Sequence, residues 1–227
     1  MLPTEKEKLK NIRKDMVSLG QSALKLNEEI LEGLEQGNLD KLKNIKLVSK
    51  QEWFARIAKI DSQIINVFAL YTPEAKDLRQ LVAFLKITNE FDRITNSCQS
   101  FMRDFPNVLR KNVDKDFILE FAIPLQKTCV VSVKNAVALL ETDDKTVAAE
   151  LYKAVAIEED ENDDLYKIIE RNLLKKMNKN IQLSREYQGA MVALRRLEKI
   201  ADRALSIAFL MQYAVIGGEI NNVKLQS

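Results

Sequence analysis

Apolar residues recur at steps of three and four along most of the chain, which is the spacing of helices that bury one face. Chain breakers interrupt this pattern, among them Gly37, Pro73 and Pro106. Thr72 and Pro73 are predicted to cap and open a helix that ends before Pro106, and Pro124 is predicted to kink the next one. Six helices are therefore expected, at residues 4–34, 39–71, 73–104, 113–141, 143–177 and 184 to Gly217 and Gly218.

Composition supports an all-α class. Hydrophobic residues make up 46% and charged residues 30% of the 227 positions, and the 6 Gly and 4 Pro are too few for a turn-rich β protein. The net charge of +2 gives no overall bias toward nucleic acid or an anionic membrane. The longest apolar stretch, at 204–216, is too short to span a bilayer, and Cys98 and Cys129 show no CxxC spacing. We expect a soluble cytoplasmic protein that does not bind nucleic acid.

The two halves of the chain resemble each other. The segment 85–96 parallels 193–202 when Asp92 is set against Glu198, and Asp61 can be set against Asp163. Three predicted helices lie on each side of the polar connection RKNVDK at 110–115. This pattern predicts two pseudo-symmetric antiparallel three-helix bundles arranged as a tandem repeat, the first over residues 1–108 and the second over residues 109–227.

Six of the seven residues in the run EEDENDD, at 158–164, are acidic. On a helix, Glu158 and Asn162 interrupt an apolar stripe, and Glu159 and Asp163 flank it four residues apart. Asp160 and Asp164 point away from the stripe, as solvated charges do.

The last predicted helix contains a second pair of acids at the same spacing. Glu198 occupies a core position and Asp202 follows one turn later. Glu159, Asp163, Glu198 and Asp202 are therefore predicted to face one another across adjacent helices, where they would repel strongly without cations. Ordinary salt bridges are the alternative, since four basic residues lie beside the second pair: Arg195, Arg196, Lys199 and Arg203.

The chain contains no histidine, which restricts the available chemistry. Neither a Glu-x-x-His di-iron site nor a His-rich zinc site can form, so carboxylates would bind Mg²⁺, Ca²⁺, Mn²⁺ or oxidised iron. No phosphate-binding glycine loop or nucleophile motif is present in the sequence. We therefore predict a protein that is not an enzyme.

Three segments resemble the PhoU family of phosphate-transport regulators. The segment 72–94 is similar to a first-repeat signature of Pro-Val-Ala-x-Asp-Leu-Arg, Leu-Lys-Ile and Asp-Leu-Glu-Arg-Ile-Gly-Asp. The segment 195–218 resembles the second-repeat counterpart, and 161–167 resembles its Glu-Val-Asp-x-Leu-Tyr segment. The matches occur in order and cover both halves, roughly residues 10–220.

The resemblance implies a frequently dimeric, cytoplasmic regulator that restrains phosphate uptake and phosphate-starvation signalling. It implies two partners, the ATPase subunit of the phosphate ABC transporter and a membrane sensor histidine kinase. Some members of the family bind multinuclear iron or other metals through E(D)-x-x-x-D motifs, which here correspond to Glu159 with Asp163 and Glu198 with Asp202.

The first repeat departs from the family pattern. It keeps Glu90 and Asp92 as secondary candidate ligands but has Asn96 where the family has an Asp. Near Asp61, the expected upstream acids are replaced by Phe54, Ile57 and Lys59. Three hypotheses follow: a regulator of phosphate transport, a metal-binding protein or metal-dependent enzyme with iron, Mg²⁺ or Mn²⁺ in the second repeat, and a helical scaffold without metal.

Overall fold

The computed structural model describes residues 4–46, 48–110 and 112–217. In this part of the chain there are seven α-helices, one short 3-10 helix and no strand. The α-helices are α1 (Glu5–Glu35), α2 (Leu39–Asn44), α3 (Lys50–Leu70), α4 (Ala75–Leu109), α5 (Lys115–Leu139), α6 (Lys145–Lys179) and α7 (Ser184–Ile216). The 3-10 helix, Ile181–Leu183, joins α6 to α7. The predicted helix end at Gly218 lies outside the described residues.

Side-chain caps explain where several helices begin. Thr4 and Glu7 form a reciprocal capping box at the start of α1. Asp114 accepts a hydrogen bond from the backbone N–H of Phe117 at the start of α5, and Asp144 caps α6 in the same way. These caps satisfy backbone N–H groups that have no partner inside the helix.

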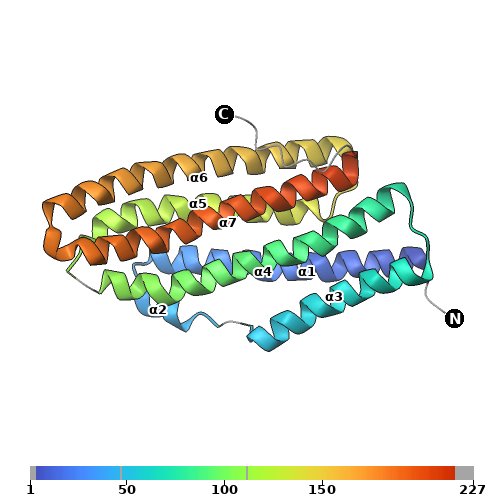
Figure 1. Cartoon of the computed structure of the whole chain (residues 1–227), viewed down its shortest axis with the longest axis horizontal. Coiled ribbons are helices and arrows are strands. Elements are labelled where there is room, and N and C mark those ends of the chain that lie inside the picture. The colour runs from blue at the N-terminus through green and yellow to red at the C-terminus, as the bar shows by residue number, and fades with distance from the viewer. Residues whose placement is uncertain (1–3, 47, 111, 218–227) are drawn as a thin grey trace.

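The long helices form two similar bundles that pack side by side (Figure 1). Helices α1, α3 and α4 make the first repeat, and α5, α6 and α7 make the second. The repeats meet mainly where α4 packs along α7, with a further contact between α1 and α5. Gly20 permits this approach, because a Cβ there would lie 2.9 Å from both Phe91 and Val137. The predicted all-α tandem repeat of three-helix units is confirmed, with α2 as an additional element.

Three predictions of helix boundaries were wrong. The predicted helix at 39–71 is divided between α2 and α3, because Ser49 adopts an extended conformation and caps a new helix through the N–H of Glu52. The Thr-Pro-Glu run at 72–74 precedes α4 rather than opening it. Pro106 lies inside α4, in its last turn, and the helix continues to Leu109 without the hydrogen bond that an N–H at position 106 would donate to the carbonyl of Met102.

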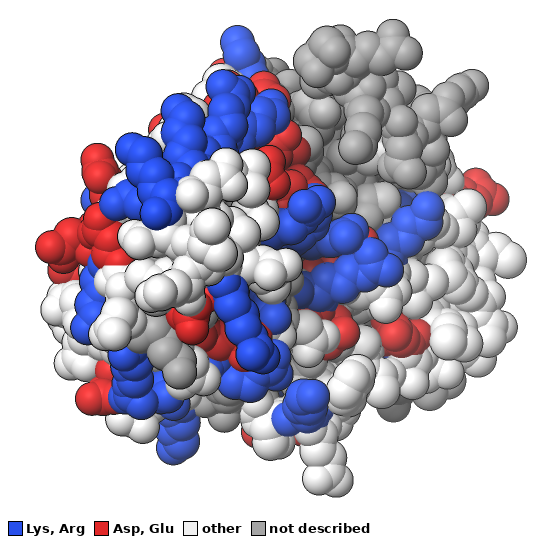
Figure 2. Space-filling model, turned by 60° about the vertical axis from the view of Figure 1, so that its left-hand side comes forward, with Lys and Arg blue, Asp and Glu red and all other residues white. Residues whose placement is uncertain are grey.

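Charged and uncharged side chains are interspersed on the face of the molecule that Figure 2 shows. Figure 2 views the molecule toward the end where α6 turns into α7, and it shows Lys and Arg side chains in local patches with acidic side chains between them. None of the described helices is long and apolar enough to cross a membrane. Charge on this surface is therefore described below for each helix face separately.

Candidate metal centre

Three acidic side chains converge between α6 and α7. Glu159 and Asp163 lie one turn apart on α6, and Asp202 reaches them from α7, which runs back along α6 after the turn at 180–183. One carboxylate oxygen from each residue lies within 4.8 Å of an oxygen of the other two. All three side chains are half-buried at the edge of the core.

The proximity of these acids changes the protonation of Glu159. Burial, together with the negative charges of Asp163 and Asp202, raises the pKa of Glu159 to about 7. Protonated Glu159 also makes a hydrogen bond with Asp202 that favours the neutral form. Without a cation, Glu159 therefore titrates near neutral pH, where its protonated and ionised forms are both populated.

Glu198 lies beside this group, one turn before Asp202 on α7. Only 8% of Glu198 is exposed, and its Oε2 atom is buried without a hydrogen-bond partner among the described residues. Lys199 lies 2.9 Å from Glu198 Oε1 and 2.6 Å from Asp202 Oδ2. Burial raises the pKa of Glu198, while the ammonium group of Lys199 opposes this shift.

The predicted alternative was that basic neighbours on α7 form salt bridges with these acids, and it holds for some of them. Lys199 does bridge Glu198 and Asp202. Arg196 instead pairs with Asp104 on α4, and Arg203 pairs with Glu90. Glu159 and Asp163 have no ion pair among the described residues, so one ammonium group faces four carboxylates.

The other residues of the acidic run at 158–164 differ in burial as their helical positions predict. Asn162 is fully buried and donates hydrogen bonds to the Leu125 carbonyl at 3.1 Å and the Thr128 hydroxyl at 2.6 Å. Glu158 is half-buried, and burial and the charge of Glu161 raise its pKa. Asp160 and Asp164 are exposed. Asn162 therefore has a structural role, since it joins α6 to α5.

The corresponding acids of the first repeat do not converge. Asp92 accepts hydrogen bonds from Trp53 Nε1 at 3.1 Å and from Asn96 Nδ2 at 2.9 Å. Asp61 lies 3.2 Å from the Thr88 hydroxyl. The role of Trp53 could not be found from the sequence, because its indole N–H becomes a donor to Asp92 only when α3 and α4 are placed together. Neutral donors thus hydrogen-bond to Asp61 and Asp92, whereas Glu90 pairs with Arg203 of the second repeat.

The geometry of the second repeat fits a hard cation. The candidate ligands are all carboxylate oxygens, which suit Mg²⁺, Mn²⁺, Ca²⁺ and oxidised iron. An unpartnered, buried Glu198 oxygen and a proton held on Glu159 are both features that a cation could replace with a favourable interaction. Such a site can hold a metal by Glu159, Asp163 and Asp202, with Glu198 close by.

Two tandem three-helix units that pack together through α4 and α7 define a class of helical repeat protein. Comparison with known proteins identifies the family within this class. The PhoU domain model matches residues 16–104 and 124–211, one match in each repeat. The chain therefore belongs to the PhoU family. No curated protein sequence matches it.

Two solved structures share the fold over almost the whole chain. The crystal structure of PhoU from Pseudomonas aeruginosa has a TM-score of 0.77 and 22% identity, and the match covers 95% of this chain and 100% of that one. The phosphate transport system regulatory protein PhoU from Streptococcus pneumoniae has a TM-score of 0.73 and 14% identity, with 96% and 100% covered. At these identities the likeness shows a common fold.

Proposed function

We propose that this protein is a cytoplasmic, non-enzymatic regulator that restrains phosphate uptake and phosphate-starvation signalling. The observation that carries the proposal is the family match in both repeats, since a PhoU relationship implies a regulatory role in phosphate transport. The solved relative from Streptococcus pneumoniae, described as a phosphate transport system regulatory protein, supports the same role. Regulation of this kind requires binding surfaces rather than a catalytic centre.

The proposed partners are the ATPase subunit of the phosphate ABC transporter and a sensor histidine kinase, and the proposed assembly is a homodimer. Long helices with exposed faces, such as α3 and α6, offer rigid surfaces for such contacts. Partner binding at these faces would couple the phosphate transporter to the kinase without any chemical step on this protein.

Co-purification and phosphate control together test the regulatory role. The tagged protein, purified from phosphate-replete cells, should bring down the ATPase subunit and the kinase, whereas an equally tagged unrelated helical bundle should not. A deletion strain should take up phosphate and express starvation genes when phosphate is plentiful. Unchanged phosphate control in the deletion strain, together with repeated failure to recover either partner, would reject the proposal.

A second candidate function is metal binding by the second repeat. We propose Glu159, Asp163, Glu198 and Asp202 as ligands for iron, Mg²⁺ or Mn²⁺, with a contribution from Asp92 or Glu90 as the weaker alternative. The close approach of three carboxylate oxygens supports this assignment, as does the buried, unpartnered oxygen of Glu198. When bound, the metal would neutralise the cluster and tie α6 to α7.

Elemental analysis after purification without chelator tests the metal proposal. The parent protein should contain stoichiometric metal, and a triple variant, Glu159→Gln, Asp163→Asn and Asp202→Asn, should not. A matched variant of the first repeat, Asp61→Asn and Asp92→Asn, should retain it. A parent protein without metal, even after dialysis against Mn²⁺ or Fe³⁺, would leave the third hypothesis, a scaffold without metal.

A further inference from the structure

The outer face of α6 is not covered by any other described helix. In Figure 1, α6 lies along the top of the molecule and packs downward against α5 and α7. Its buried residues, including Val155, Tyr166 and Leu173, face these helices. Two of the four large apolar side chains exposed on α6 lie on the opposite side: Ile157 at 55% and Ile168 at 47%. At eleven residues apart, or about three turns, they lie on one line of the helix.

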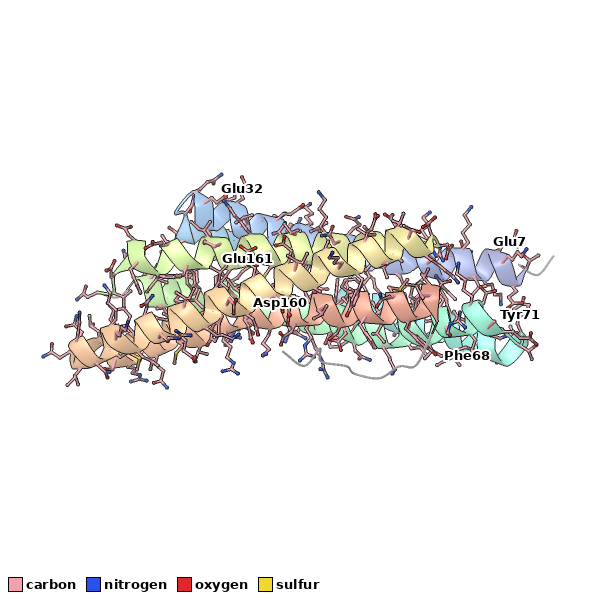
Figure 3. The ribbon with its side chains drawn as sticks, turned by 90° about the horizontal axis from the view of Figure 1, so that it is seen from above. Glu7, Glu32, Phe68, Tyr71, Asp160 and Glu161 are labelled. Carbon is pink, nitrogen blue, oxygen red and sulfur yellow. The ribbon has the colours of Figure 1, made fainter. Side chains whose placement is uncertain are left out.

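Charge along this outer face changes sign at its middle. Over residues 157–179, the exposed charged residues are acidic as far as Asp164 and basic from Lys167 onward: Asp160, Glu161 and Asp164, followed by Lys167, Arg171, Lys175 and Lys179. Figure 3 looks down on α6 and labels Asp160 and Glu161 along the middle of the helix. Lys167 pairs with Asp164 within the helix at 3.2 Å. Among the described residues the other five charges have no ion pair.

We propose that this face binds the same face of a second copy, with the two α6 helices antiparallel and a two-fold axis at Ile168. In a two-fold contact, the same surface of each copy meets in opposite directions. Each half of that surface must therefore be complementary to the other half. The outer face of α6 has this property, because its acidic half then meets the basic half of the second copy. An anionic membrane would be attracted to one half and repelled by the other.

The positions along the helix specify the register. Glu161 and Lys175 each lie seven residues from Ile168, so Glu161 of one copy lies opposite Lys175 of the other. Asp164 and Arg171 lie four and three residues from the same axis and also come close. The two-fold axis generates each of these attractions twice, and it buries Ile168 against its own copy. At 1.5 Å per residue, the contact from 157 to 179 extends over about 33 Å.

The expected dimer is reversible and sensitive to salt, because its ion pairs lie at an exposed surface. This inference rests on the homodimer part of the proposed function and names the surface that forms it. The regulatory role is tested separately by phosphate control in cells, so failure of either proposal can be distinguished from failure of the other.

Sedimentation velocity of the full chain at low and high salt tests the charge pattern. Lys175→Glu and Glu161→Lys should each weaken the dimer about tenfold or more, since each reversal turns two attractions into two repulsions. The double reversal should restore it, and so should mixing the two single variants. Lys134→Glu, an exposed reversal on α5, is the matched control and should have no effect.

Cysteine cross-linking tests the register. Ile168→Cys should form a disulfide-linked dimer under oxidising conditions, whereas Ile65→Cys, on the exposed face of α3, should not. The native Cys98 and Cys129 are buried, so they do not interfere. A dimer that tolerates both charge reversals and does not cross-link at 168 overturns the proposal. A chain that stays monomeric under all these conditions overturns it together with the homodimer.

Discussion

The two repeats share one three-helix plan but treat their acidic side chains in opposite ways. In the second repeat, Glu159, Asp163 and Asp202 converge with one ammonium group, that of Lys199, at their edge. In the first repeat, hydrogen bonds from neutral groups satisfy Asp92, with an indole and an amide as donors. The same fold thus holds either a cluster of like charges or isolated, satisfied acids.

The difference follows from a few substitutions between equivalent positions. Setting Asp92 against Glu198 places Asn96 opposite Asp202, and setting Asp61 against Asp163 places Ile57 opposite Glu159. Asn96 converts a potential repulsion into a hydrogen bond to Asp92, because its amide donates where a carboxylate cannot. One amide and one apolar side chain are therefore enough to remove the cluster.

Packing also differs between α6 in the second repeat and α3 in the first. Helix α6 is held firmly between α5 and α7, whereas α3 makes sparser contacts with α1 and α4. Three large apolar side chains remain exposed on α3: Phe54, Ile65 and Leu70. Trp53, which is buried at the start of α3, is accordingly a principal link between this helix and the rest of its repeat.

The largest expected effect on stability follows removal of the Trp53 side chain. Trp53→Ala should lower the free energy of unfolding by about 3–5 kcal/mol, because it leaves a cavity and removes one of the two side-chain hydrogen bonds to Asp92. Phe54→Ala, at the adjacent exposed position, should change it by less than about 0.5 kcal/mol. Chemical denaturation measures both values, and similar losses for the two variants would show that α3 is not anchored through Trp53.

In the metal-free protein, an amide should give a more stable fold than an acid at position 96 of the first repeat and at position 163 of the second. Asn96→Asp removes the donor to Asp92 and adds a like charge, so it should destabilise by about 1–2 kcal/mol. Asp163→Asn relieves repulsion of Glu159 and should stabilise by about 0.5–1 kcal/mol. Thermal and chemical denaturation in the presence of a chelator provide the comparison, and effects of the same sign would contradict it.

The raised pKa of Glu159 predicts a dependence of stability on pH that Gln should remove. Because the folded state holds this proton more tightly than the unfolded state, its contribution to stability is full below about pH 4.5 and is lost as pH rises through about 7. After allowance for solvent screening, the loss is on the order of 1–2 kcal/mol for the metal-free protein. Glu159→Gln should flatten the profile in this interval, and metal affinity should rise over the same interval in the parent.

The smallest expected effect concerns Lys199. Its ammonium group occupies two of the carboxylates that a metal would use, so Lys199→Met should increase metal affinity by about three- to tenfold. Lys134→Met, on α5, is the matched control for loss of one positive charge. Isothermal titration with Mn²⁺ measures both, and weaker binding by the Lys199 variant would show that this side chain assists the site.

Much of this arrangement could be predicted from the sequence, because periodicity and caps are local signals. The apolar repeat located the long helices, and it placed Glu159, Asp163 and Asp202 on the sides of α6 and α7 that meet. The break between α2 and α3 was missed, since apolar spacing continues along the sequence and only Ser49 marks a new start. The contacts of Asp92 with Trp53 and of Lys199 with two acids depend on interatomic distances, which a sequence pattern does not specify.

The most direct test of the central claim is the location of bound metal by anomalous X-ray diffraction from crystals soaked in Mn²⁺. The account predicts anomalous density between α6 and α7, beside Glu159, Asp163 and Asp202, and none beside Asp61 and Asp92. Anomalous density in the first repeat, or its absence between α6 and α7 at saturating Mn²⁺, would contradict the account.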